Sequence, residues 1–325
     1  MVKVCNAKVL CGKINNYSNL EGHFLLKYAI SAPSCLNTQP WLFKIQGDKI
    51  KLIVDIRRWR KIGDTDQREL YISAGCALEN LLIAAEHFGY SHQVFYGEDE
   101  HAAIIELIPS GKSSPFRGPE LFEAIPQRYT NRKIYENRVL APEILKLLQN
   151  VCIEEELKLN LACDTETKGK ANDLLKQAYA IQLSNVAFRK ELGYWLGQGL
   201  FGNSWIKSKI TDMITTNKNV GKNRAKKFSE LLMSASVFGI ISSEKNDRMA
   251  QVKAGQILER VWLKAAALGI SLHPVSQFLE LPELKEEVKK LIPNTNIHPQ
   301  LTFGLGYAEP VKKHMTRRTM REFIV

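Results

Sequence analysis

The 325-residue sequence contains no uninterrupted apolar run of the roughly 18 residues that a membrane-spanning helix needs. Its cysteines form no C-x-x-C pair and its histidines do not cluster, which argues against a zinc site or an iron–sulfur cluster. Residues 1–12 lack a clear cleavage site, so we expect no export signal. The six cysteines are scattered, which suits a reducing compartment, so we expect a cytoplasmic protein without a metal site: Cys5, Cys11, Cys35, Cys76, Cys152 and Cys163.

Several common catalytic motifs are also missing. The sequence has no P-loop, no G-x-S-x-G and no H-E-x-x-H. Residues 304–306 (GLG) do not form a dinucleotide-binding fingerprint, because no helical pattern follows them. A Rossmann-type enzyme is therefore not expected.

The composition is that of a globular protein, with 45% hydrophobic and 24% charged residues, and the length suggests about two domains. The formal net charge is +11, and basic runs occur at residues 218–227 and 312–321. Neither run has interleaved aromatic residues or a nucleic-acid-binding motif. We interpret them as a solvated basic surface or as part of a site for a small anion, and we expect no nucleic-acid partner.

The sequence contains an internal repeat. Residues 73–90 align without gaps on residues 253–270, and six of the 18 positions are identical, where about one is expected by chance. The identical pairs are Ala74/Ala254, Gly75/Gly255, Leu78/Leu258, Glu79/Glu259, Ala85/Ala265 and Gly89/Gly269. A chance match of two amphipathic helices is the alternative, but we interpret the repeat as a duplication.

Each copy has the apolar spacing of a helix and ends at a glycine. The early glycine costs up to about 1 kcal/mol relative to alanine in a helix interior. We therefore expect the two helices to pack closely, with the bare Cα of each glycine facing a backbone. Alternating patterns predict strands at residues 103–108 and 300–306, and residues 109–119 read as a linker between two lobes, 1–115 and 116–325. Residues 171–227 have no counterpart in the first half and are a candidate lid.

Residues 31–41 (SAPSCLNTQPW) form a polar loop after the helical pattern of residues 24–30. Two prolines restrict its backbone, and it concentrates Ser34, Asn37 and Gln39, whose polar groups suit a heteroaromatic edge or a sugar chain. The alternative is a capping loop whose polar groups satisfy local backbone. The sequence that follows predicts a hairpin with Gly47-Asp48 at its turn.

Two further segments could bind a ligand. Residues 128–132 (RYTNR) place two guanidiniums and a hydroxyl where they can clamp a phosphate, and a solvated basic turn is the alternative. Residues 273–277 (HPVSQ) follow the second repeat helix, where a turn would present the backbone N–H groups of Ser276 and Gln277. We interpret His273 as structural, because a lone histidine rarely acts as a general acid.

These segments, in this order, resemble the nitroreductase superfamily, and most closely its single-chain Acg-like branch. The family motif A-P-S-x-x-N-x-Q-P-W resembles residues 32–41, R-x-[ST]-x-R resembles residues 128–132, and residues 64–90 resemble the helix motif that begins D-x-x-x-R-E-L. PVSQ and the terminal LTFGLGYAEP with TRRTMREFIV complete a correspondence that covers nearly the whole chain. Tyr129 and Thr319 depart from the family pattern.

The resemblance implies an α+β fold, with mostly antiparallel sheet flanked by helices and two pseudo-symmetric lobes in one chain. It also implies one FMN per chain rather than two. Arg128, Thr130 and Arg132, with Arg317 or Arg318, should hold the phosphate and ribityl chain. Ser34, Asn37 and Gln39 should approach from the other lobe, and Ser276 and Gln277 should line the isoalloxazine.

The resemblance further implies an FMN-dependent oxidoreductase that takes hydride from NAD(P)H and passes it to a small acceptor by a ping-pong mechanism. Nitroaromatics, quinones and enones are all compatible with the sequence. FMN carries the chemistry, so we assign no catalytic side chain. The alternative is a protein that holds or sequesters FMN with little turnover. We also expect a monomer, because the fused lobes supply each other's partner surface.

Overall fold

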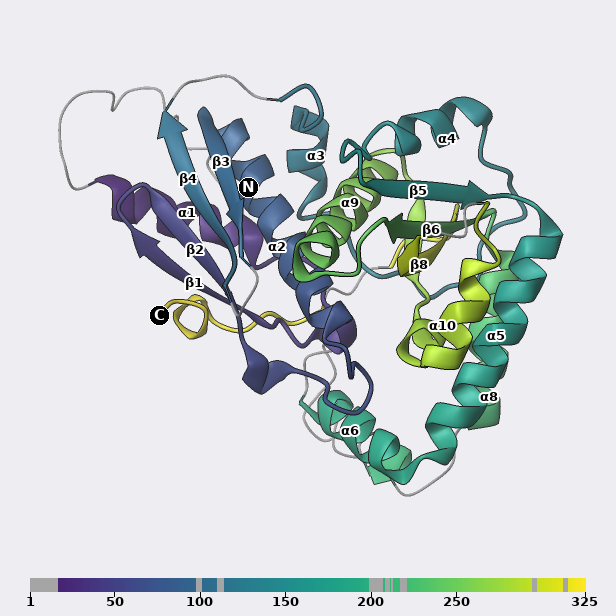
Figure 1. Cartoon of the computed structure of the whole chain (residues 1–325). Coiled ribbons are helices and arrows are strands. Elements are labelled where there is room, and N and C mark those ends of the chain that lie inside the picture. Colours follow the sequence, from purple (N-terminus) through teal and green to yellow (C-terminus); the bar gives the residue numbers. More distant parts are fainter. Residues whose placement is uncertain are drawn as a thin grey trace.

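Two four-stranded antiparallel sheets, with helices between and around them, make up the structure (Figure 1). The computed structural model describes residues 17–97, 101–109, 114–198, 207, 211, 213–216, 221–293, 297–311 and 315–325. The α+β fold with two lobes predicted from the sequence is confirmed, and each lobe has a sheet of its own. In the described residues, no helix is both long and apolar enough to cross a membrane.

The first lobe contains one sheet and the helices that pack on it. Its elements are α1 (Tyr17–Ala29), η2 (Cys35–Asn37), β1 (Trp41–Gln46), β2 (Lys49–Val54), η3 (Ile56–Arg58), α2 (Arg68–His87), β3 (Tyr90–Tyr96) and β4 (His101–Pro109). The hairpin turns at Gly47, whose positive φ of 65° suits glycine. Both the predicted hairpin and the predicted strand at 103–108 are confirmed.

The second lobe repeats this plan and adds helices. Its elements are α3 (Pro119–Ala124), α4 (Pro142–Gln149), β5 (Leu157–Ala162), α5 (Thr165–Ser184), α6 (Val186–Gly197), α8 (Gly221–Ser234), β6 (Val237–Ser243), α9 (Arg248–Ala267), β7 (Ser271–Pro274), η4 (Gln277–Glu280), α10 (Pro282–Lys289), β8 (His298–Gly306) and η5 (Met320–Glu322). The predicted strand at 300–306 lies within β8.

The two sheets have the same topology. Their strand orders are β1-β2-β4-β3 and β5-β6-β8-β7. Strands β5 to β8 therefore occupy the same positions in the second sheet as β1 to β4 occupy in the first. The central pair of each sheet also carries an irregularity at a matching place, between Leu52 and Ile53 in β2 and between Ile241 and Ser242 in β6. Bulges are specific local features rather than random defects, so this match extends the duplication from the repeat helix to the whole sheet.

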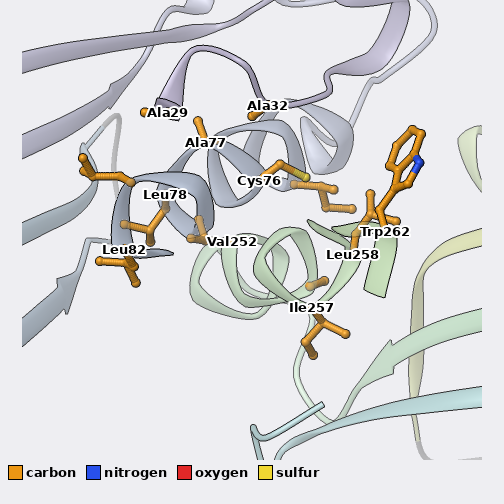
Figure 2. Close-up of a cluster of buried hydrophobic side chains, with 14 of the residues drawn as sticks. Ala29, Ala32, Cys76, Ala77, Leu78, Leu82, Val252, Ile257, Leu258 and Trp262 are labelled. Atoms are coloured by element: carbon orange, nitrogen blue, oxygen red, sulfur yellow. The ribbon is translucent and has the colours of Figure 1, made fainter. Parts of the chain in front are cut away.

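The repeat helices α2 and α9 cross against each other between the sheets (Figures 1 and 2). A Cβ on Gly75 would lie 1.9 Å from the carbonyl oxygen of Val252, and a Cβ on Gly255 would lie 2.0 Å from that of Ile72. Ile72 and Val252 stand directly before the two copies of the repeat, at the same offset along the chain, so the close contacts of the two helices are symmetric. The repeated glycines therefore permit the close approach that the sequence predicted.

Both helices end in the same way. Gly89 and Gly269 adopt positive φ values of 86° and 69° after α2 and α9, which is the left-handed C-terminal cap that favours glycine. Each turn leads directly into a sheet strand, β3 or β7. The terminal glycines of the repeat thus form the turns that connect α2 and α9 to equivalent strands of the two sheets.

The C-terminal tail crosses back to the first lobe. Phe43 in β1 donates its N–H to the carbonyl of Phe323 and accepts the N–H of Val325, so residues 323–325 extend the edge of the first sheet. Phe323 is fully buried and stacks on Trp41 at 6.4 Å between ring centroids. The C-terminus accordingly lies beside β1 (Figure 1).

Candidate functional site

Two adjoining cavities lie between the lobes, beside the crossing of α2 and α9. Their volumes are about 180 Å³ and 140 Å³, and they share walls made by Ser34, Leu36, Thr130 and Arg132. We call the first the arginine cavity, because Arg128, Arg132 and Arg317 line it, and the second the ring cavity. Figure 2 shows Cys76, Leu258 and Trp262, which line the ring cavity, on one side of the helix crossing.

Two guanidiniums of the arginine cavity donate hydrogen bonds to the same backbone carbonyl. Arg128 Nη2 and Arg317 Nη2 each donate to the carbonyl oxygen of Ser31 at 2.9 Å, and Arg317 Nη1 donates to Asn37 Oδ1 at 2.8 Å. Arg128 also lies 4.7 Å from the centroid of the Trp262 ring. These contacts fix both guanidiniums against the start of the 31–41 loop.

Arg132 differs from its neighbours, because the described residues offer it neither a hydrogen bond nor a carboxylate. It reaches both cavities from the irregular segment 128–132. Its side chain is exposed, and the partial desolvation by the surrounding cavity walls lowers its pKa. No helix begins at this segment, so the backbone contribution that a helix start would add to a phosphate site is not available there.

Positive charge exceeds negative charge in the arginine cavity. Among the described residues, the carboxylate that pairs with these arginines is that of Glu259, which is fully buried and 3.3 Å from Arg128 Nε. Burial raises the pKa of Glu259 to about 7, although Arg128 acts in the opposite direction. Burial, followed by repulsion from Arg128, lowers the pKa of Arg317 to about 10. Three guanidiniums line this cavity, and one weak acid lies beside two of them, so the site favours an anion.

The 31–41 loop holds its shape through unusual backbone angles. Leu36, Asn37 and Gln39 all have positive φ, between 48° and 54°, a region that costs non-glycine residues of the order of 1 kcal/mol or more each. Ser34 Oγ accepts the backbone N–H of Gln39 at 2.8 Å. Such strain persists only where surrounding contacts over-determine it, and it often occurs at binding sites.

Gln39 and Arg318 lie behind the cavities rather than in their walls. Gln39 is fully buried, its Oε1 accepts the N–H of Arg318, and its own carbonyl accepts from Arg318 Nη1. The two residues tie the loop to the C-terminal tail. The other eight predicted site residues line one cavity or both: Ser34, Asn37, Arg128, Thr130, Arg132, Ser276, Gln277 and Arg317.

The ring cavity has a mixed wall. Ser276 and Gln277 stand at the start of η4, and Gln277 Oε1 is buried without a hydrogen-bond partner. Apolar surface comes from Ile72, Leu258 and Trp262. His273 does not line either cavity: it is buried and stacks on Phe228, and desolvation lowers its pKa well below the usual range. A flat heteroaromatic group fits this combination of apolar walls and one unpaired amide oxygen.

A charged cluster, which the sequence did not reveal, includes three residues of the ring-cavity wall, Cys35, Glu69 and Glu280. Arg60 Nη1 donates to Glu69 Oε2 at 2.9 Å, to Glu280 Oε1 at 3.1 Å and to Cys35 Sγ at 2.8 Å. The thiol and the two carboxylates have ligand atoms within 4.8 Å of one another, a spacing that would suit a metal ion. The guanidinium already bonds to all three, so it supplies the cation of this grouping.

The place equivalent to the arginine cavity in the other half of the duplication is filled. Glu79, the repeat partner of Glu259, pairs with Arg260 at 3.0 Å and with Arg117 at 2.7 Å. Although burial opposes it, these two arginines lower the pKa of Glu79 to about 2. Arg260 stands where the first copy has Asn80, and its guanidinium also bonds to Glu154. One half of the pseudo-symmetric pair is therefore open and the other is occupied by side chains.

The two departures from the family pattern have structural roles. The Tyr129 hydroxyl accepts the N–H of Val311 at 3.0 Å. Thr319 forms a capping box with Glu322 at η5. Both residues fasten the tail that brings Arg317 to the cavity, so neither removes a group from it.

The candidate lid and the basic runs lie partly outside the described residues. Within residues 171–227, helices α5 and α8 pack on each other, and no described side chain lines either cavity. Glu191 on α6 accepts the N–H groups of Ile62 and Gly63, which joins this segment to the first lobe. Residues 218–220 and 312–314 of the two basic runs are not described.

No family model matches the chain. A protein of Mycobacterium tuberculosis with the provisional name NAD(P)H nitroreductase is 24% identical over 295 residues, which cover 87% of this chain and 84% of that protein. Another from the same species, provisionally named NAD(P)H nitroreductase Acg, is 22% identical over 304 residues and covers 89% of each chain.

Among solved structures, a provisionally named nitroreductase of Anabaena variabilis superposes with a TM-score of 0.54 at 12% identity, over 92% of this chain and 90% of its own. A nitroreductase of Desulfitobacterium hafniense with bound FMN covers 61% of this chain and 94% of its own at a TM-score of 0.43 and 15% identity. The Anabaena structure shares the fold over nearly the whole of both chains, the two lobes included.

Proposed function

We propose that this chain, which belongs to the nitroreductase superfamily, is an FMN-dependent oxidoreductase with one FMN site, formed by the arginine and ring cavities together. The observation that carries the proposal is the excess of positive charge at Arg128, Arg132 and Arg317 beside a cavity with apolar walls. The names of the relatives from M. tuberculosis and the bound FMN in the D. hafniense structure support the same assignment.

The residues present fit FMN on two observations. Arg132 has a guanidinium without an anionic partner among the described residues, as a phosphate site requires. Gln277 has a buried amide oxygen without a donor in the wall of the ring cavity, as the polar edge of a heteroaromatic ring requires. FMN with its phosphate at Arg132 and its ring beside Gln277 would give each of these two side chains a partner.

In this proposal each residue has a defined task. Arg128, Arg132 and Arg317 neutralise the phosphate, and Thr130, Ser34 and Asn37 offer polar groups along the shared wall. Ile72, Leu258 and Trp262 exclude water from the ring cavity. Gln39 and Arg318 hold the 31–41 loop against the C-terminal tail. FMN, when bound, supplies the two-electron chemistry.

The finer proposal is that NAD(P)H reduces the protein and that a nitroaromatic, a quinone or a similar small electrophile reoxidises it. Both would use the ring cavity in turn, which gives a ping-pong mechanism. The four described cysteines are free thiols, which supports a cytoplasmic location. A protein that merely stores FMN would have the same phosphate site but a closed ring cavity.

Adding reduced nicotinamide under anaerobic conditions to the yellow purified protein tests this. We expect the flavin absorbance to bleach and to recover when benzoquinone is added. Flavin that stays oxidised with both NADH and NADPH, but is reduced by dithionite, would instead identify a storage protein. A colourless protein that does not take up added FMN would contradict both.

A further inference from the structure

Glu280 stands in the wall of the ring cavity, at the end of η4 and three residues beyond Gln277. Its side chain is only 5% exposed, and both of its oxygens accept hydrogen bonds: Oε1 from Arg60 at 3.1 Å and Oε2 from Gln182 on α5 at 2.7 Å. Glu280 is therefore held firmly at the surface of a cavity that, under the proposed function, receives the flavin ring and the acceptor.

The buried charges around Glu280 do not balance. Asp64, Glu69 and Glu280 supply three carboxyl groups, and Arg60 and Arg68 supply two guanidiniums. Asp66 is excluded from this sum because Lys285 pairs with it at 3.2 Å. An unmatched charge away from water is costly, so the cluster favours the state that carries one extra proton.

The groups packed around Glu280 indicate which carboxyl holds that proton. Arg60 faces it from the chain after η3, Glu69 and Arg68 from α2, Cys35 from η2, and Gln182 with Tyr179 from α5. Burial raises the pKa of Glu280 to about 8, with Arg60 acting against it, and burial raises the pKa of Asp64 to about 6. The Asp64 carboxylate also accepts the backbone N–H groups of Glu69 and Leu70, which favours its ionised form. We therefore assign the extra proton to Glu280.

We propose that Glu280 donates a proton to the acceptor that is reduced in the ring cavity, with Arg60 positioning its carboxyl group. This inference rests on the proposed function. For a quinone, FMN, if bound and reduced, would supply the hydride (two electrons and one proton), and the carboxylic acid of Glu280 would supply the second proton. An O–H bond of Glu280 breaks, an O–H bond of the hydroquinone forms, and the carboxylate regains its proton from water.

The neutral acid also explains why an acidic side chain is tolerated beside the ring. A carboxylate there would oppose negative charge developing on the ring or the acceptor, whereas a carboxylic acid can donate to it. Arg60 bonds to Glu69 and Glu280 together, so a proton lost from Glu280 leaves a charge that Arg60 continues to stabilise. Proton release and recovery then occur without rearrangement of the cluster.

The test compares Glu280→Gln with Glu283→Gln, an exposed glutamate three residues away. Glutamine has the shape of the neutral acid and keeps an acceptor for Arg60, so the fold should persist. Dithionite-reduced, FMN-loaded protein is mixed with benzoquinone from pH 6 to pH 10. We expect Glu280→Gln to bind FMN within about twofold of the original chain but to reoxidise about 100-fold more slowly, as general-acid loss predicts, and to lose the fall in rate above pH 8. Glu283→Gln should match the original.

Infrared difference spectra between pH 6 and pH 10, on protein without flavin, give a second readout. A carboxylic-acid carbonyl band should titrate near pH 8 in the original chain and in Glu283→Gln, and should be missing in Glu280→Gln. Normal FMN binding with an unchanged rate and pH profile in Glu280→Gln would overturn the proton-donor role alone. Failure of all three proteins to bind FMN would overturn the proposed function and, with it, this inference.

Discussion

Arg132 is the guanidinium whose contribution is easiest to isolate, because it has no hydrogen bond or ion pair among the described residues that a substitution would also break. We predict that Arg132→Ala weakens FMN binding by roughly 10- to 150-fold, the loss of one charge-assisted bond of about 1.5–3 kcal/mol. Arg132→Lys should restore only part of the lost FMN affinity, since an ammonium lacks the planar fork of donors that a guanidinium offers to phosphate. Fluorescence titration measures both.

The matched control for Arg132 is its neighbour Lys133, which is exposed and pairs with Glu309 at 2.6 Å. Lys133→Ala removes one positive charge from the residue next to Arg132. It should leave FMN affinity within about twofold, because exposed ion pairs contribute little. Equal losses in both variants would mean that the cavity attracts FMN by overall charge and not by a contact from Arg132.

Glu259 competes with the phosphate for Arg128, so its titration should control affinity. Above its pKa of about 7 the carboxylate pairs with Arg128, and below that it is neutral. We predict that Glu259→Gln binds FMN about fivefold more tightly above pH 8, equivalent to ~1 kcal/mol for removal of one nearby charge, and equally well near pH 5. The same benefit at every pH would exclude titration of Glu259 as the cause.

The same residue should affect stability. An acid whose pKa is higher in the folded than in the unfolded chain stabilises most below the unfolded value, and that stability is lost as pH rises to the folded value. Glu259 should therefore make the protein about 3 kcal/mol less stable at pH 8 than at pH 4, from a rise of the pKa from 4.5 to about 7. Urea denaturation of Glu259→Gln should lack this component of the pH dependence.

At the scale of elements, the crossing of α2 and α9 depends on Gly75 and Gly255. A methyl group on Gly75 would lie 1.9 Å from a backbone oxygen, which can move only if α9 moves. We predict that Gly75→Ala or Gly255→Ala destabilises the fold by about 3 kcal/mol or more, at or beyond the usual range for overpacking. Denaturant midpoints measure this loss.

Gly169 offers the control for the crossing. It lies inside α5, and a Cβ there would meet no atom within 4 Å. Gly169→Ala should stabilise the protein by up to about 1 kcal/mol through helix propensity alone. If the alanine variants of Gly75 and Gly169 behaved alike, close backbone contact between the repeat helices would not be what the glycines provide.

Much of this element plan could be predicted from the sequence, because it is local. The repeat, the terminal glycines and the alternation of apolar residues determine α2, α9 and the strands that follow them. The positive φ of Leu36, Asn37 and Gln39 was not predictable, since no glycine marks it. The cluster at Arg60 was not either: its members come from four separate segments, and only folding brings Glu280 beside Glu69.

At the scale of the molecule, the fused lobes already provide each other with a partner surface. The tail of the second lobe completes the sheet edge of the first, and α2 is buried against α9. We predict a monomer, so light scattering should give a mass near 36.9 kDa. A stable particle of twice that mass would contradict the argument from duplication.

The asymmetry of the two halves leads to the most direct test. One half of the pseudo-symmetric pair is open at Arg128 and Arg132, and the other is filled by Arg260 and Arg117. Titrating flavin-free protein with FMN, while following the quenching of flavin fluorescence, counts the sites. We predict saturation at one FMN for each 36.9 kDa chain. Saturation at two, or no saturable quenching, would contradict it.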